Sequence, residues 1–229
     1  MSKSPSQPPA ENLAEWNNEM FLKHPTPYTG LAGRVEKKRA EAIAKEIRER
    51  KSNDQFSLLE IGCEAGRLLS ILRSFFPRAK FYGQDISTVA LDEARKNLGD
   101  GVVLEQSDLA SEQMELHIPN LNFIVCSETL EHIPDINAAV ANLKKIATPE
   151  QYVIITVPYE KTKNNIKIIL NRLKIFDFLM KGIEKEFSEW HVNDFSKEDL
   201  YRLFGDEFEI LKYKKIYALH QLLVMRKKA

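Results

Sequence analysis

Five short apolar runs, separated by segments with helical spacing, constrain the fold of this chain most strongly. The runs are FSLLEIG (56–62), KFYGQD (80–85), VVLEQ (102–106), NFIVCS (122–127) and QYVIITV (151–157). Strands that alternate with helices are typical of a parallel sheet with helices on its faces. The last two runs are apolar on both faces, as expected for central strands of such a sheet. We therefore predict an α/β fold with a doubly wound parallel sheet.

The segments around these runs carry the end signals of helices. An apolar helical face after the first run stops at Pro77, and a helix over 87–98 is followed by a glycine. Asp135 is a favourable N-cap for a third helix, and apolar residues at multiples of four predict an amphipathic helix over 31–50. These helices would cover the sheet.

The C-terminal part of the chain has a different pattern. A helix over 196–204 begins with a capping-box-like Ser196-x-x-Asp199. The runs FEILKYKKIYA and HQLLVMRKK then follow with no helix between them, which predicts an antiparallel hairpin at the sheet edge. The expected fold is thus a Rossmann-like, seven-stranded sheet, mostly parallel with an antiparallel edge hairpin.

We expect one domain over residues 13–229, preceded by a disordered Ser/Pro/Gln-rich segment over residues 1–12. Within the domain, the expected parts are an N-terminal helical cap (13–55), a cofactor-binding core (56–157), a helical insertion or lid (158–195) and a C-terminal helix with a β-hairpin (196–229).

The insertion is apolar with interspersed basic residues, and residues 161–185 contain seven Lys or Arg against two acids. Three interpretations remain open: a helical insertion packed on the sheet edge, a lid over a substrate pocket, or an amphipathic face that contacts a membrane.

Composition excludes few functions. Lys and Arg total 33, as do Asp and Glu, so no overall field attracts nucleic acid or acidic lipid. The two cysteines, Cys63 and Cys126, lie in apolar strand-like segments, which favours free thiols in a reducing compartment over a disulfide framework. The first residues contain no apolar segment, and no run is long enough to span a bilayer. We expect a cytoplasmic protein.

The most informative segment is LLEIGCEAGRLL (58–69), a strand, a glycine-containing turn and a helix. Gly62 and Gly66 permit close backbone approach, and Asp85 closes the second strand 19 residues after Gly66, where a carboxylate accepts hydrogen bonds from an adenosine ribose. Glu64 in the turn would repel the pyrophosphate of a dinucleotide but tolerates the sulfonium and ammonium of S-adenosylmethionine. The turn therefore favours S-adenosylmethionine over a nicotinamide cofactor.

With these residues the chain resembles class I S-adenosylmethionine-dependent methyltransferases, in particular the branch similar to ubiquinone-biosynthesis O-methyltransferases. The resemblance covers residues 56–157 and continues more weakly to the C-terminus. It departs from the family pattern at Glu64, which replaces the middle glycine of the turn, and at Asn122, where the family often has Asp. The resemblance implies a cofactor site made of Glu60, Gly62, Cys63, Glu64, Gly66, Asp85, Ile86, Asp108, Leu109 and Ser127.

Two histidines are candidate catalytic bases. His132 follows the fourth strand at the carboxyl edge of the predicted sheet, and His191 follows the insertion, where related enzymes often place a histidine near the substrate. His24, His117 and His220 have no such placement and are interpreted as surface or structural residues.

The run Glu128-x-x-Glu131-His132, together with His191, also resembles the metal-binding set of small-RNA 2′-O-methyltransferases. Carboxylate and imidazole ligands suit Mg²⁺, Mn²⁺ or Zn²⁺. The alternative is that Glu128 and Glu131 brace the loop before Pro134 with no metal bound.

We therefore expect an S-adenosylmethionine-dependent methyltransferase that forms S-adenosylhomocysteine and acts on a small molecule, most simply at a hydroxyl group. Nucleic acid is a less expected partner. The alternatives are a metal-dependent RNA 2′-O-methyltransferase and a protein that binds S-adenosylmethionine without catalysis. The acceptor, the pathway and the oligomeric state are not encoded in these patterns.

Overall fold

A computed structural model of the chain describes residues 12–23, 30–116, 118, 120–159 and 191–229. The predicted disordered segment (1–12, except for Asn12), most of the predicted insertion, His24 and His117 lie outside the described residues.

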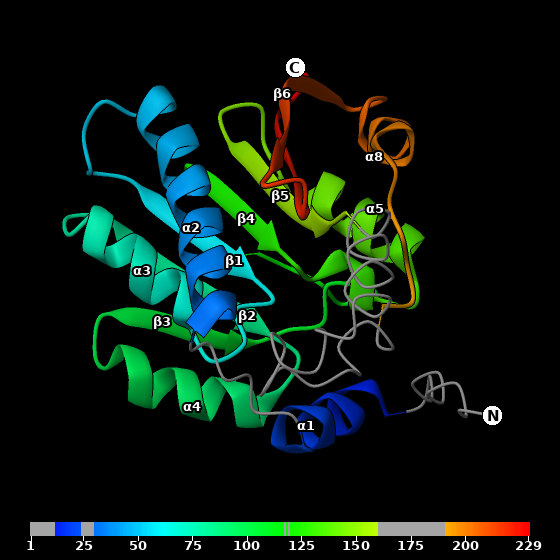
Figure 1. Ribbon diagram of the computed structural model, residues 1–229. Coiled ribbons are helices and arrows are strands. Elements are labelled where there is room, and N and C mark those ends of the chain that lie inside the picture. The colour runs from blue at the N-terminus through cyan, green and yellow to red at the C-terminus, as the bar shows by residue number, and fades with distance from the viewer. Residues whose placement is uncertain (1–11, 24–29, 117, 119, 160–190) are drawn as a thin grey trace, which may run out of the picture.

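The described elements follow the predicted alternation of strands and helices (Figure 1). Two helices come first, and the C-terminal hairpin comes last. In chain order the elements are α1 (Leu13–Lys23), α2 (Gly30–Arg50), β1 (Ser57–Ile61), α3 (Arg67–Phe75), β2 (Lys80–Asp85), α4 (Thr88–Leu98), β3 (Val102–Gln106), β4 (Phe123–Ser127), the 3₁₀ turn η1 (Leu130–His132), α5 (Ile136–Ile146), β5 (Tyr152–Pro158), α8 (Lys197–Phe204), β6 (Phe208–Ile216) and β7 (His220–Lys227).

The strands form one seven-stranded sheet in the order β3-β2-β1-β4-β5-β7-β6. The first five pair in parallel, whereas β7 pairs antiparallel with both β5 and β6. The predicted fold is therefore confirmed, including the antiparallel hairpin at the edge. Strand order reverses between β1 and β4, and in open α/β sheets the crevice at such a point, outside the carboxyl ends of the strands, is where ligands bind.

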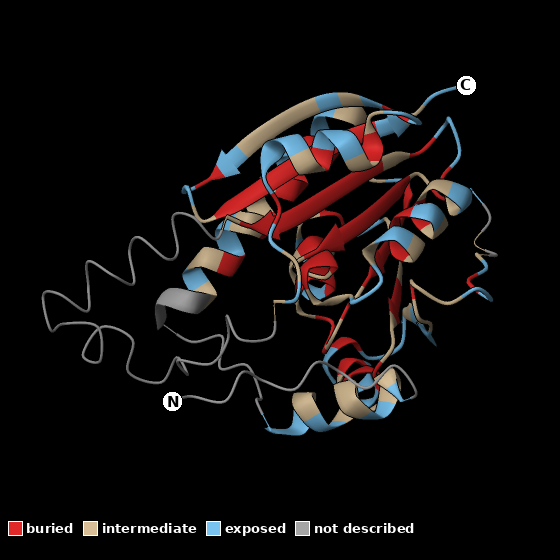
Figure 2. Ribbon diagram, turned by 90° about the vertical axis from the view of Figure 1, so that its right-hand side faces the viewer, coloured by how far each residue is buried: buried red, intermediate tan, exposed pale blue. Residues whose placement is uncertain are grey.

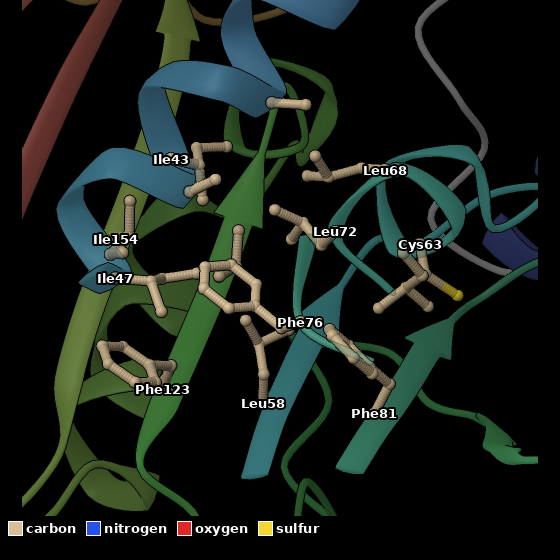
Figure 3. Close-up of a cluster of buried hydrophobic side chains, with 14 of the residues drawn as sticks. Ile43, Ile47, Leu58, Cys63, Leu68, Leu72, Phe76, Phe81, Phe123 and Ile154 are labelled. Carbon is tan, nitrogen blue, oxygen red and sulfur yellow. The ribbon is translucent and has the colours of Figure 1, made fainter. Parts of the chain in front are cut away.

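Neighbouring residues on the central strands point to opposite faces of the sheet, and each face has its own core. Leu58, Phe123 and Ile154 belong to the cluster under α2, α3 and α4, which Figure 3 shows in part. Leu59 and Ile124, one position further along, belong to the cluster under α5 and α8. Figure 2 shows the central strands buried beneath these helices. Burial on both faces explains why these runs are apolar throughout.

Local signals in the sequence account for the helix starts. Ser87 caps α4 by accepting a hydrogen bond from the amide of Ala90, and Asp135 caps α5 in the same way through Ala138. The predicted capping box of α8 is present between Ser196 and Asp199. Among the described residues, no helix is long and apolar enough to cross a membrane.

Candidate active site

The turn after β1 lies against the loop after β4, at the point where strand order reverses. Gly62 has a φ of +73°, and a Cβ atom there would lie 2.3 Å from the Thr129 hydroxyl oxygen. The Thr129 hydroxyl in turn donates to the carbonyl oxygen of Ile61 at 3.3 Å. Gly62 is therefore required both by its left-handed backbone and by the close approach of the two loops.

Asp85 joins this turn to the start of α4. Its Oδ2 accepts a hydrogen bond from the amide of Glu64 (2.8 Å), and its Oδ1 accepts one from the amide of Ser87 (2.8 Å). Burial raises the pKa of Asp85 to about 6, although these two amides oppose the rise. Glu64 adopts a φ of 47°, so the residue that replaces the family glycine keeps a glycine-like backbone.

Glu60 is the buried acid of the site. Its side chain lies at the carboxyl end of β1, the residue is only 3% exposed, and its Oε2 has no hydrogen-bond partner among the described residues. Burial raises the pKa of Glu60 well above its usual range, and the positive charge of Arg39 opposes this. A buried polar atom without a partner is costly in a native protein, which points to a ligand that would supply one.

The remaining predicted cofactor residues line the same edge or brace it. Asp108 accepts a hydrogen bond from the amide of Ala110 (2.8 Å), and the carbonyl oxygen of Leu109 accepts one from Asn142 (2.8 Å). Ile86 accepts a hydrogen bond from Gln106 at its carbonyl oxygen (3.1 Å). The buried Ser127 hydroxyl bonds to Thr156 on β5 (2.8 Å).

The other two predicted positions fill the base of the turn. Cys63 is buried in the core under α3, and burial raises the pKa of its thiol, so it packs as an apolar residue rather than as a nucleophile. Gly66 immediately precedes α3 and is left-handed, with a φ of +75°.

A charged cluster that sequence spacing did not reveal lies between α2 and the carboxyl ends of β1 and β4. Arg39 on α2 has an Nε without a hydrogen-bond partner among the described residues, and its Nη1 lies 3.5 Å from Glu128 Oε2. The same Glu128 oxygen lies 2.7 Å from Nδ1 of the buried His220, which begins β7. On α2, the buried Glu36 accepts a hydrogen bond from Arg67 Nε (3.1 Å). Burial raises the pKa of Glu36, and a perturbed carboxylate in a cluster of charged side chains is typical of functional sites.

The two candidate catalytic histidines lie side by side. The ring centroids of His132 and His191 are 4.9 Å apart, at an angle of 66°. The segment that carries His191 is fixed to the loop after β4 by its backbone. The amides of Val192 and Asn193 donate to the carbonyl oxygen of Glu131 (2.8 and 3.1 Å). The Asn193 side chain also donates to the carbonyl oxygens of Leu130 and Ile133 (3.2 and 2.7 Å).

Three of the four predicted metal-ligating residues come together. One possible ligand atom from each of Glu131, His132 and His191 lies within 4.8 Å of the other two, and Glu131 is buried. Glu128 is not part of this group. Its φ of 53° takes the backbone out of helical geometry, and its carboxylate contacts His220 instead.

Comparisons with known proteins agree with this architecture. A family profile described as "Methyltransferase domain" matches residues 31–208. A ubiquinone biosynthesis O-methyltransferase from Paraburkholderia xenovorans is 28% identical over 128 residues, which cover 55% of this chain and 54% of that protein. A malonyl-[acyl-carrier protein] O-methyltransferase from Anoxybacillus flavithermus is 31% identical over 109 residues, 45% of this chain and 40% of that protein. The chain thus matches about half the length of these curated relatives, or less.

Solved structures show the same fold at lower identity. A SAM-dependent methyltransferase from Anabaena variabilis superposes with a TM-score of 0.70 at 18% identity, over 99% of both chains. Magnesium protoporphyrin IX methyltransferase from Synechocystis, solved with bound SAH, superposes with a TM-score of 0.66 at 16% identity, over 96% of this chain and 100% of that one. Because the family profile extends over most of the chain, from α2 to the start of β6, the protein belongs to the methyltransferase-domain family, among the class I S-adenosylmethionine-dependent methyltransferases.

Proposed function

We propose that this chain transfers a methyl group from S-adenosylmethionine to a hydroxyl group of a small molecule. The observation that supports this most directly is the pair of imidazoles, His132 and His191, in contact at the carboxyl edge of the sheet. The loop that carries His132 also contains Thr129, which lies against the candidate cofactor turn at Gly62. A base beside the cofactor is what methylation of a hydroxyl requires.

The residues at the switch point fit S-adenosylmethionine. The unpartnered Glu60 Oε2 would accept a hydrogen bond from the ammonium group of the methionine, and Arg39, whose Nε also lacks a partner among the described residues, would donate to its carboxylate. Asp85 retains lone pairs for the ribose hydroxyls, because each of its oxygens accepts one amide. When bound, the cofactor supplies an electrophilic methyl group on a sulfonium, together with a good leaving group.

The chain's own residues would then position and deprotonate the acceptor. A neutral imidazole can accept the hydroxyl proton as a general base. Either His132 or His191 would hold that proton, and the contact between the two rings would restrict the orientation of each. Holding the nucleophile in line with the methyl group and excluding water supply much of the remaining rate enhancement.

The same group of side chains offers a divalent metal site. Glu131, His132 and His191 would hold Mg²⁺, Mn²⁺ or Zn²⁺, since carboxylate and imidazole ligands suit these ions. Such an ion would lower the pKa of a hydroxyl bound to it, which is an alternative to deprotonation by a free imidazole.

The names of the relatives support oxygen as the methylated atom. Both the ubiquinone biosynthesis enzyme and the malonyl-[acyl-carrier protein] enzyme are described as O-methyltransferases. The RNA alternative has no comparable support among them, and the resemblance of the Glu128 to His132 run to RNA-modifying enzymes is weakened because Glu128 contacts His220.

The test combines binding with transfer. Calorimetric titration with S-adenosylhomocysteine, with and without EDTA, measures cofactor binding, and transfer of a labelled methyl group is then followed with hydroxylated small molecules and with small RNAs. We expect His132→Ala and His191→Ala to lower turnover with little change in affinity for S-adenosylhomocysteine. Val192→Ala, at the exposed neighbour of His191, is the matched control.

Each outcome has a distinct meaning. Loss of turnover on chelation would favour the metal site over a free imidazole. Unchanged turnover in both histidine variants would refute their roles. Tight binding without transfer to any acceptor would support the non-catalytic alternative.

A further inference from the structure

Helix α1 has an unusual attachment to the rest of the protein. It contains apolar residues such as Trp16, Met20 and Phe21, yet none of its residues is buried. Among the described elements its main packing partner is α4, and Figure 1 shows it beneath the carboxyl ends of the first strands, beside the start of α4. No apolar side chain of α1 is fully buried, so polar contacts are also needed to fix its position on α4.

Those contacts converge on one side chain, Asn18. Its Oδ1 accepts hydrogen bonds from the Ser87 hydroxyl (2.7 Å) and from the amide of Val89 (3.2 Å). Its Nδ2 donates to the Thr88 hydroxyl (3.3 Å). The first amides of a helix have no partner within the helix, and Ser87 itself satisfies only the amide of Ala90 with its side chain. Asn18 thus supplies a second cap to α4 from a helix some 70 positions away in the chain.

The capped end of α4 is also part of the candidate ribose site. The amide of Ser87 donates to Asp85 Oδ1, while the other oxygen of Asp85 accepts the amide of Glu64 in the glycine turn. A continuous series of hydrogen bonds therefore runs from α1, through Asn18 and Ser87, to the carboxylate at the end of β2. Docking of α1 and the orientation of that carboxylate depend on the same residue, Ser87.

We propose that Asn18 is a positioning residue that couples docking of α1 to cofactor binding at Asp85. This inference rests on the proposed cofactor site. Ribose bound at Asp85 holds Ser87 in place and so strengthens the attachment of α1, and by thermodynamic linkage docked α1 strengthens cofactor binding by the same factor.

The chain contains a matched control. Asn17, the preceding residue, has the same side chain, but its Nδ2 donates to the carbonyl oxygen of Leu13 within α1 (2.8 Å). Asn17→Ala therefore removes a hydrogen bond within α1 and leaves the bonds between Asn18 and α4 in place. Asn18→Asp is the rescue variant, because a carboxylate can still accept from the Ser87 hydroxyl and the Val89 amide, and it is favourable at a helix N-terminus.

The experiment measures amide hydrogen exchange in α1 and the dissociation constant of S-adenosylhomocysteine for the full chain and the three variants. In the wild type, we expect the ligand to slow exchange in residues 13–23. Asn18→Ala should lose this protection and bind the ligand about threefold to tenfold more weakly, the effect typical of losing such hydrogen bonds. Asn17→Ala and Asn18→Asp should retain both properties, and a rescue by Asn18→Asp shows that loss of folding is not the cause.

Two results would overturn the inference while leaving the cofactor site intact. In one, Asn18→Ala binds the ligand as Asn17→Ala does. In the other, exchange in α1 is the same with and without ligand in the wild type. A folded wild-type chain that fails to bind S-adenosylhomocysteine at all would instead overturn the cofactor site, and this inference with it.

Discussion

Substitution of Gly62 by alanine tests the architecture of the cofactor turn most directly. A Cβ atom at this position would lie 2.3, 2.4 and 2.9 Å from the Oγ1, Cγ2 and Cβ atoms of Thr129, closer than side-chain atoms can approach. The new methyl group would also occupy a residue with a φ of +73°. The substitution therefore combines backbone strain with a steric clash between the two loops that border the site.

The magnitude follows from these two terms. A left-handed backbone costs a non-glycine residue about 1–2 kcal/mol, and overpacking of a close contact costs about 1–3 kcal/mol. The free energy of unfolding should therefore fall by about 2–5 kcal/mol, which lowers the Tm of a chain of this size by roughly 5–15 °C. Because relief of the clash must move the turn or Thr129, affinity for S-adenosylhomocysteine should fall as well, by about tenfold for each 1.4 kcal/mol of lost binding free energy.

Gly99→Ala separates the cost of backbone strain from the cost of the steric clash. Gly99 also has a positive φ of +60°, but a Cβ atom there would have no neighbour within 4 Å. This control should lose stability through backbone strain alone and should bind S-adenosylhomocysteine as the wild type does. Thermal unfolding and calorimetric titration measure both quantities. If Gly62→Ala matches the wild type in Tm and in affinity, the close approach of the loops is not a property of the folded protein.

Three further predictions concern the same edge of the sheet. Glu64→Gly should raise the free energy of unfolding by about 0.5–1 kcal/mol, since relief of left-handed strain outweighs the greater unfolded-state entropy of glycine, and a lower Tm in thermal unfolding would contradict this. Burial raises the pKa of Asp85 to about 6, so between about pH 4 and pH 6 the folded protein without ligand keeps a proton on Asp85 that the unfolded chain has lost. This contribution to stability is therefore present at about pH 4 and is lost as the pH rises through about 6, and an Asp85→Asn variant should lack it when unfolding is followed against pH. Ribose hydroxyls donate better to the ionised carboxylate, so affinity for S-adenosylhomocysteine should rise over the same interval, and a flat calorimetric profile would argue against Asp85 as the ribose ligand. Asn193→Ala removes the side-chain hydrogen bonds to the carbonyl oxygens of Leu130 and Ile133, which hold the segment of His191 against the loop after β4. Methyl transfer should therefore slow while affinity for S-adenosylhomocysteine is kept. An equal loss of transfer and of affinity would show that Asn193 does more than position His191.

Sequence patterns predicted those parts of the fold in which a local signal and the tertiary structure agree. The central strands are apolar at successive positions because both faces of the sheet are buried, and this signal is visible within each run. The starts of α4, α5 and α8 were predictable because a capping residue acts within three positions of itself. Asp85 could be recognised for a similar reason, since its place at the end of β2 follows from the strand.

Residues that act across the fold left no such signal. Arg39 is one of many charged residues on α2, and only its contact with Glu128 in the folded protein distinguishes it from the exposed ones. His220 begins a strand 92 positions after the acid it contacts. Asn193 and Asn18 look like ordinary polar residues of a loop and a helix, yet their side chains bond to distant backbone or capping groups. Contacts of this kind depend on strand order, which no local periodicity encodes.

The Glu128 to His132 run shows how the backbone decides what a motif presents. On a continuous helix, residues three positions apart share one face, and Glu128 would then lie beside Glu131. Here the chain leaves β4 through a left-handed Glu128, and η1 begins only at Leu130. This left-handed backbone directs the Glu128 carboxylate toward α2 and β7, where it contacts Arg39 and His220. The Glu131 carboxylate lies instead beside His132 and His191. One short motif thus supplies an acid to each of two groups of side chains. Glu128 belongs to the charged cluster near the proposed methionine end of the cofactor, whereas Glu131 belongs to the proposed acceptor side.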